Sequence, residues 1–198
     1  CISPNRFYVQ ENVKNEFVNA FIDRAKKLKI GNGMDEGVNL GPLTTAKRLE
    51  EIERLVDKTK KEGAEVLLGG KRPSGFNKGF FYEPTVFDHV KDDFTIMKEE
   101  PFGPLVPMLS FKSFDEVIER ANDNDLGLCS YLYTNSMDKA NRGSELLETG
   151  CVAVNTGAVA IAEAPFGGIK QTGYGREGGS MAIKDYLNVK YTHMALEI

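Results

Sequence analysis

The sequence predicts an α/β fold, in which a mostly parallel sheet is flanked by helices. Segments with strand and helix patterns alternate between residues 105 and 155, which is the order expected of βαβ units. A highly charged segment over residues 44–62 repeats its apolar side chains at helical spacing, so it should cover one face of that sheet. Beyond Ala164 the chain becomes rich in glycine and then regains strand character over residues 186–194. We therefore expect a sheet body, a glycine-rich loop and a C-terminal strand.

The elements of the first half follow from their apolar periodicity. Residues 6–10 alternate between apolar and polar side chains, which predicts a strand. A helix is expected over residues 11–27, because its apolar side chains recur on one face. These side chains are Val13, Phe17, Phe21, Ala25 and Leu28. The helix over residues 44–62 should turn Leu49, Ile52 and Leu55 inward. Two strands are expected next, over residues 64–68 and 79–87.

The second half opens with an apolar strand over residues 105–111. Ser113, with Glu116 three residues later, forms a capping box that should begin a helix over residues 114–122. Another helix is expected over residues 138–148, just before Gly150. The remaining strands are predicted over residues 128–134 and 151–155.

The composition is that of an ordinary globular protein and argues against several kinds of partner. The 198 residues are 41% hydrophobic and 27% charged, and the formal net charge of −4 disfavours a nucleic-acid surface. No apolar run is long enough to span a bilayer, so we expect no membrane partner. The three cysteines lack CxxC spacing and the two histidines stand singly, so we expect neither a disulfide framework nor a metal site. A cytoplasmic location is expected, although a targeting signal upstream of Cys1 would not be visible.

Cys1 is the residue most suggestive of chemistry. The chain opens on this cysteine rather than on a methionine, from which we expect it to be part of a longer protein. A cysteine becomes a nucleophile where a base, a cation or a helix N-terminus favours its thiolate. The alternative is that a cysteine in front of a strand is inert packing.

A second candidate site is the turn over residues 100–104, directly before an apolar strand. The turn should leave the Glu100 carboxylate and the Phe102 ring at the end of that strand. A carboxylate can accept hydrogen bonds from ribose hydroxyls, and a ring can pack on a flat heterocycle. The alternative is a solvated acidic turn. The glycine-rich run over residues 164–177 lets the backbone approach a ligand, but it matches neither GxGxxG nor a P-loop.

Taken together, the order and spacing of these segments resemble the catalytic half of an NAD(P)-dependent aldehyde dehydrogenase. The resemblance covers essentially the whole chain. The matching segments are Cys1 with Asn5-Arg6, Gly41-Pro42-Leu43, Glu100-Pro101-Phe102-Gly103-Pro104, Val154-Asn155, Pro165-Phe166-Gly167-Gly168 and Gly175-Arg176-Glu177-Gly178. Within that family, residues 155–157, 164–173 and 185–191 most resemble the succinate-semialdehyde dehydrogenase branch.

The resemblance implies roles for individual residues. Cys1 would attack the aldehyde carbon to give a thiohemiacetal, which loses hydride to the nicotinamide of NAD or NADP and becomes a thioester that water hydrolyses. Glu100 would hold the nicotinamide ribose, and Phe102 would bound the nicotinamide. Phe166 would line the aldehyde pocket together with the loop over residues 156–164.

The same resemblance leaves the substrate open. Ala160 stands where succinate-semialdehyde enzymes tend to have a serine that helps to hold the distal carboxylate. Losing such a donor should cost about 1.5–3 kcal/mol of binding free energy if nothing replaces it. Succinate semialdehyde or a related semialdehyde is the expected substrate, and an uncharged aliphatic aldehyde is the alternative.

The resemblance also implies a domain organisation. Residues 1–182 would form the catalytic domain, and residues 183–198 would form an oligomerisation arm. The strand of this arm would pair with a neighbouring subunit in a homodimer or homotetramer. In the family the cofactor domain, the general-base glutamate and an oxyanion-binding asparagine all precede the nucleophile. We therefore expect this chain by itself not to oxidise aldehydes.

Three other functions are alternatives to aldehyde oxidation. An N-terminal-nucleophile hydrolase would use the α-amine of Cys1 as its base, but it would not explain the segments at Glu100 and Phe166. A scaffold or oligomerisation fragment would need no catalysis. A CoA-acylating relative would release the thioester to CoA instead of water.

Overall fold

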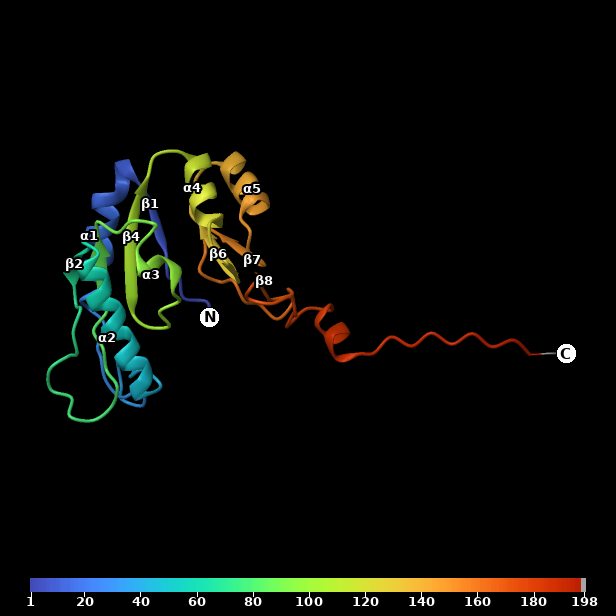
Figure 1. Cartoon of the computed structure of the whole chain (residues 1–198), viewed down its shortest axis with the longest axis horizontal. Coiled ribbons are helices and arrows are strands. Elements are labelled where there is room, and N and C mark those ends of the chain that lie inside the picture. The colour runs from blue at the N-terminus through green and yellow to red at the C-terminus, as the bar shows by residue number, and fades with distance from the viewer. Residues whose placement is uncertain (197–198) are drawn as a thin grey trace. The chain divides into compact units, whose positions relative to one another are not determined.

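The computed structural model describes residues 1–196, which form two compact units (Figure 1). The first unit contains Cys1 and Ser3–Ala121, and the second contains Ile2 and the chain from Asn122 onward. The division expected after residue 182 stays a prediction. Among the described residues, no helix is both long enough and apolar enough to cross a membrane.

The first unit is built on a four-stranded sheet in the order β1-β4-β3-β2. Its strands are β1 (Phe7–Gln10), β2 (Glu65–Leu68), β3 (Thr85–Asp88) and β4 (Leu105–Phe111). The central strand β4 runs parallel to both β1 and β3, whereas β2 is antiparallel to β3. The α/β class predicted from the sequence is confirmed, with a mixed sheet.

Helices cover both faces of this sheet. The helix α2 (Ala46–Lys61) buries Ile52 in a cluster with Phe87, and neither side chain is exposed to solvent. The helix α1 (Lys14–Ala25), which follows the 3-10 turn η1 (Glu11–Val13), buries Val18 in a second cluster with Val86. Neighbouring residues of a strand point to opposite faces, so Val86 and Phe87 place α1 and α2 on opposite sides. The inward apolar face predicted for residues 44–62 is therefore confirmed.

In the part of the second unit that the structure describes, the main elements are two short strand pairs and the helix α5 (Met137–Leu146). The pairs are β5 (Leu126–Gly127) with β8 (Ile169–Lys170), which are antiparallel, and β6 (Cys129–Leu132) with β7 (Cys151–Val154), which are parallel. The helix α5 lies between β6 and β7 in the chain, so these three elements form the expected βαβ unit.

Two predicted strands differ from the structure. Of residues 79–87, only those from Thr85 onward lie in β3, because Gly79 has a φ of 90° and Pro84 has no N–H to donate to a ladder. The C-terminal strand over residues 186–194 is absent: a 3-10 helix, η2 (Ala182–Tyr186), is followed by unpaired chain as far as residue 196. A strand exists only where a partner takes up its backbone groups, and the single chain offers none there. The short helix α3 (Thr95–Lys98) was not predicted.

The capping box at the start of α4 (Phe114–Asn122) is confirmed and carries a stability prediction. The Glu116 N–H donates to Ser113 Oγ at 3.2 Å, and the Ser113 N–H donates to the Glu116 carboxylate at 3.4 Å. We expect Ser113→Ala to lower the free energy of unfolding by about 1 kcal/mol, because an N–H of the first turn loses its acceptor. Urea denaturation followed by circular dichroism measures this loss. Ser74→Ala, in an exposed loop, is the control and should change little.

Candidate active site

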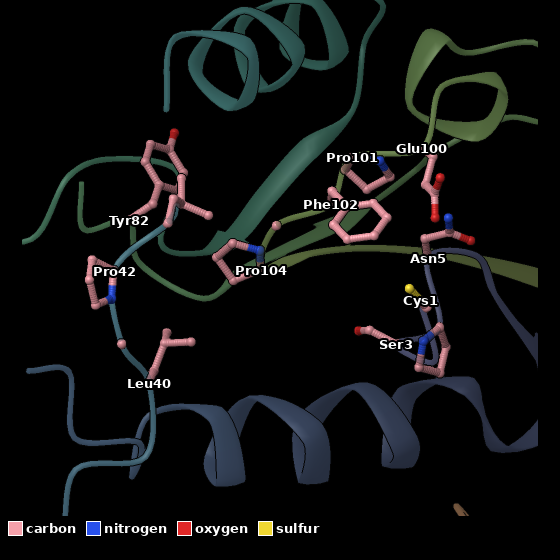
Figure 2. Close-up of a pocket in the computed structure, with 14 residues that line it drawn as sticks. Cys1, Ser3, Asn5, Leu40, Pro42, Tyr82, Glu100, Pro101, Phe102 and Pro104 are labelled. Atoms are coloured by element: carbon pink, nitrogen blue, oxygen red, sulfur yellow. The ribbon is translucent and has the colours of Figure 1, made fainter. Parts of the chain in front are cut away.

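The strand pairing explains why two distant segments of the first unit converge. Residues 1–6 lead into β1, and residues 99–104 lead into β4. Because β1 and β4 are parallel neighbours, their preceding segments arrive at the same end of the sheet. They enclose a pocket of about 460 Å³, whose lining includes Cys1, Asn5, Pro42, Tyr82, Glu100 and Phe102. Figure 2 shows Cys1, Asn5 and Glu100 on one side of this pocket and Pro42 and Tyr82 on the other.

The segment that carries Cys1 is held in place by the contacts of β1 and of the residue just before it. The Arg6 guanidinium donates to the Ala121 carbonyl at 2.9 Å. The Arg120 guanidinium lies over the Tyr8 ring, 4.9 Å from its centre, and donates to the Ser110 carbonyl at 2.7 Å. These contacts fix β1 against α4 and β4. The Cys1 side chain itself is exposed, so it can meet a ligand that enters the pocket.

The turn over residues 100–104 is held in an unusual backbone conformation. Phe102 has a φ of 45°, a left-handed value that costs a bulky residue about 1–3 kcal/mol. Gly103 lies so close to α2 that an added Cβ would stand 2.4 Å from the Ile52 side chain. The Pro104 carbonyl accepts a hydrogen bond from the Thr85 N–H at 2.8 Å. Packing and hydrogen bonding thus hold the strained turn, which leaves the Phe102 ring 52% exposed in the pocket.

The wall that faces Cys1 is apolar and was not identified from the sequence. Tyr82 is only 3% exposed, and burial raises the pKa of its phenol to about 12, so it stays neutral. Leu40 and Pro42 line the same wall. Gly41-Pro42-Leu43 was one of the segments that resemble the family, but nothing in the sequence indicated that it would face Tyr82. The resulting pocket combines a thiol, a carboxylate and flat apolar surfaces, which suits a planar ring with a polar attachment.

A smaller polar hollow of about 270 Å³ adjoins the pocket and shares Glu100 and Pro101 with it. Its charges are paired: Arg48 lies 2.9 Å from the Glu51 carboxylate, and Arg54 contacts Glu99. The Arg48 guanidinium also donates to the Pro101 carbonyl at 3.3 Å, which ties α2 to the turn. The hollow therefore extends the pocket with polar groups, and among its charged residues Glu100 is the one that these two ion pairs leave out.

Two of the residues singled out from the sequence, Ala160 and Phe166, belong to the second unit. Ala160 is exposed in a loop, and Phe166 is half-buried. The Phe166 backbone exchanges two hydrogen bonds with Glu177, at 2.6 and 2.7 Å, which closes the turn between them. The loop begins at Asn155, which has a φ of 56° and whose amide bonds both backbone groups of Thr134 at 2.9 Å. Roles for Ala160 and Phe166 stay predictions.

The fold and the pocket define an α/β protein with a cysteine beside a carboxylate and an aromatic ring. The model of a protein family described as "Aldehyde dehydrogenase family" matches residues 1–192. The chain belongs to the aldehyde dehydrogenase family. This membership sets aside the hydrolase alternative.

Individual relatives are similar over almost the whole chain. It is 42% identical over 195 residues to the mitochondrial succinate-semialdehyde dehydrogenase of Oryza sativa subsp. japonica, covering 98% of this chain and 36% of that protein. It is 43% identical over 191 residues to glutarate-semialdehyde dehydrogenase of Pseudomonas putida, covering 96% and 39%. It is 45% identical over 190 residues to aldehyde dehydrogenase 1A1 of Bos taurus, covering 96% and 38%. The chain thus spans less than two fifths of the length of these curated relatives.

A solved structure supports the same fold. A point mutant of betaine aldehyde dehydrogenase from Staphylococcus aureus, in complex with NAD⁺ and with a BME-modified cysteine, superposes with a TM-score of 0.90. The two proteins are 39% identical, over 94% of this chain and 38% of that one.

Proposed function

We propose that the protein to which this chain belongs oxidises an aldehyde to a carboxylate, with Cys1 as the nucleophile and NAD or NADP as the oxidant. The observation that carries the proposal is that Cys1, Glu100 and Phe102 line one pocket of the first unit. They come from segments almost a hundred residues apart, which only the parallel pairing of β1 with β4 brings together.

In this proposal the Cys1 sulfur attacks the aldehyde carbon and forms a thiohemiacetal. A thiolate suits this step because it is a strong nucleophile and later a good leaving group. The nicotinamide cofactor, when bound, accepts the hydride that leaves this carbon. Water then hydrolyses the thioester that remains on Cys1. We favour hydrolysis of the thioester over its transfer to CoA, because the presence of both Glu100 and Phe102 resembles the family members that release their product to water.

The geometry of the pocket fits the nicotinamide end of such a cofactor. The Glu100 carboxylate can accept hydrogen bonds from two ribose hydroxyls. The exposed Phe102 ring, opposite the apolar wall at Tyr82, can bound a flat heterocycle. The rest of the cofactor is proposed to bind mainly to parts of the protein that lie outside this chain.

The proposed substrate is succinate semialdehyde or a related semialdehyde. The names of two relatives, from Oryza sativa and Pseudomonas putida, support this class. Phe166 and the loop around Ala160 are proposed to line the aldehyde pocket. The methyl group of Ala160 cannot donate a hydrogen bond to the distal carboxylate of a semialdehyde. In addition, the chain is as similar to an aldehyde dehydrogenase 1A1 as it is to these two semialdehyde dehydrogenases. An uncharged aliphatic aldehyde is therefore the second candidate.

The proposed assembly is a homodimer or homotetramer in the cytoplasm. Its support is the run of exposed apolar side chains near the C-terminus: Ile183, Tyr186, Leu187, Val189 and Tyr191. A second subunit could pair with this segment and give it the strand partner that it lacks in the single chain. This chain alone is proposed to be inactive, and to contribute the nucleophile and the part of the cofactor pocket around the nicotinamide.

The test is a substrate and cofactor panel on the whole protein. Reduction of the nicotinamide is followed by its absorbance with succinate semialdehyde, glutarate semialdehyde and an uncharged aliphatic aldehyde, each with NAD and with NADP. A strong preference for one semialdehyde supports the proposed substrate class. Equal or better turnover of the uncharged aldehyde retains the chemistry and rejects that class. No turnover with any aldehyde would leave the scaffold alternative.

Glu100→Gln tests the ribose contact. An amide keeps the size of the side chain but loses the charge that strengthens hydrogen bonds from hydroxyls. We expect the KM for the cofactor to rise about 10-fold, which corresponds to about 1.4 kcal/mol. Steady-state kinetics with varied cofactor measure the change, and Glu50→Gln on the exposed side of α2 is the matched control. An unchanged KM and kcat would show that Glu100 does not contact the cofactor.

A further inference from the structure

The second unit contains a pair of cysteines that the proposed reaction does not use. Cys129 and Cys151 lie on the parallel strands β6 and β7 and are partners in the same register. Side chains of in-register neighbours project from the same face of a sheet, so the two thiols stand next to each other. Both are free and only half-buried, which leaves them open to a small reagent.

Each thiol makes one weak hydrogen bond, and losing it would cost little free energy. The Cys129 sulfur lies 3.8 Å from the Tyr131 hydroxyl, and the Cys151 sulfur lies 3.6 Å from the Gly167 carbonyl oxygen. The Tyr131 hydrogen is already donated to the Ile2 carbonyl at 2.5 Å, so this phenol can only accept from Cys129. A thiol is a weak donor, so replacing these contacts loses little free energy.

The spacing of the strands decides which chemistry suits the pair. Adjacent strands lie about 4.8 Å apart, whereas the Cβ atoms of a disulfide are about 3.8 Å apart. A direct S–S bond would therefore have to draw β6 and β7 together, but one atom between the sulfurs would not. Among the described residues no third histidine, cysteine or acidic side chain completes a group that could hold a metal, which disfavours four-coordinate zinc.

We propose that Cys129 and Cys151 form a two-thiol site for a soft, thiol-seeking centre that takes two sulfur ligands, of the class of trivalent arsenicals. With an organic arsenoxide, two S–H bonds and the As=O bond break, and two As–S bonds form. The oxygen leaves as water with both protons. Arsenic stays trivalent, so no electron donor or acceptor is needed.

Binding at this site would also alter a contact in the turn at Phe166. Once its sulfur is bound, Cys151 can no longer donate to the carbonyl of Gly167, the residue after Phe166. An added Cβ at Gly150 would stand only 1.8 Å from the same oxygen, so the Gly167 carbonyl has little room to move on that side. Inhibition by this route rests on the proposed function, whereas binding of the arsenical does not.

The binding test uses phenylarsine oxide and the whole protein with Cys1→Ser, so that the exposed thiol of Cys1 does not react. Mass spectrometry is expected to find an adduct that survives excess mercaptoethanol and is removed by dithiothreitol. Cys129→Ala and Cys151→Ala should each weaken binding about 100-fold, because one thiol loses the advantage of a second attachment. Ser130→Ala, on the other face of β6, is the matched control.

Peptide mapping keeps the test independent of whether these variants fold. In the protein that retains both cysteines, phenylarsine oxide should protect Cys129 and Cys151 together from iodoacetamide. Alkylation of either cysteine in the presence of the arsenical would overturn the proposal, as would undiminished binding by the folded Cys151→Ala variant. A disulfide between the two cysteines that forms in air and blocks the arsenical would overturn it as well.

An activity measurement separates this proposal from the proposed function. After treatment with phenylarsine oxide and then excess mercaptoethanol, which frees a singly attached arsenical from Cys1, the unsubstituted protein should stay inhibited in aldehyde oxidation, whereas Cys151→Thr should recover its activity. Equal inhibition of both would reject the link through Gly167. A protein that binds the arsenical at these two cysteines but oxidises no aldehyde would confirm the site and reject the proposed function.

Discussion

Replacing Cys1 with serine is expected to lower kcat/KM for aldehyde oxidation by the whole protein by about 10³-fold or more. A serine hydroxyl is ionised far less readily than a thiol, and its alkoxide is a poorer leaving group from the acyl intermediate. The pocket should keep its shape, because the Cys1 side chain is exposed and serine is of similar size. Steady-state kinetics with the preferred aldehyde measure the loss of activity.

Cofactor binding distinguishes a chemical effect from unfolding. The Cys1→Ser protein should still bind the nicotinamide cofactor with a similar Kd, because Glu100 and Phe102 are unchanged. Cys129→Ser is the control, since it alters another accessible thiol that lies in the second unit. If Cys1→Ser retained most of the activity, the nucleophile would have to be another group.

Gly150→Ala is expected to lower the free energy of unfolding by about 3 kcal/mol, at the upper end for overpacking. The new Cβ would stand 1.8 Å from the Gly167 carbonyl oxygen and 2.9 Å from the Gly168 Cα. Both neighbours are backbone atoms, so relief requires the β7 end or the glycine-rich turn to move. Urea denaturation followed by circular dichroism measures the loss.

A second glycine of the same unit provides the comparison. At Gly157 an added Cβ would meet nothing within 4 Å, so Gly157→Ala should change stability by less than about 0.5 kcal/mol. Similar stability losses in the two variants would show that the contact between Gly150 and Gly167 does not limit the packing. Because Gly167 follows Phe166, Gly150→Ala should also reduce activity more than Gly157→Ala.

Local patterns in the sequence were sufficient to predict several helices and their buried faces. The spacing of Leu49, Ile52 and Leu55 predicted which face of α2 is buried, because one turn of helix brings such residues to one side. The Ser113 capping box predicted the start of α4, since its hydrogen bonds involve only residues three apart. Such features depend on short stretches of chain, which is why a single sequence reveals them.

Features that depend on distant partners were harder to predict. Tyr82 lies in a segment expected to be strand, yet it forms the apolar wall of the pocket, because β3 begins only at Thr85. The apolar pattern over residues 186–194 suggested a strand, but a ladder needs a second strand that the single chain does not supply. Cys1, Glu100 and Phe102 were singled out from their chemistry and their positions, and the family resemblance supplied their expected roles. Their convergence follows from the β1–β4 register.

Because of this register, sliding one strand along the other can change the distance between the Cys1 thiol and the Glu100 carboxylate only in discrete steps. Sliding β1 by one residue along β4 would turn its buried side chains to the wrong face, so the smallest tolerated slip is two residues, or about 6.6 Å. A shift of that size would separate the two groups altogether. Fine adjustment of the pocket can therefore come only from the short lead-in segments, residues 2–6 and 101–104. Mutations that alter the geometry without unfolding the sheet should accumulate there.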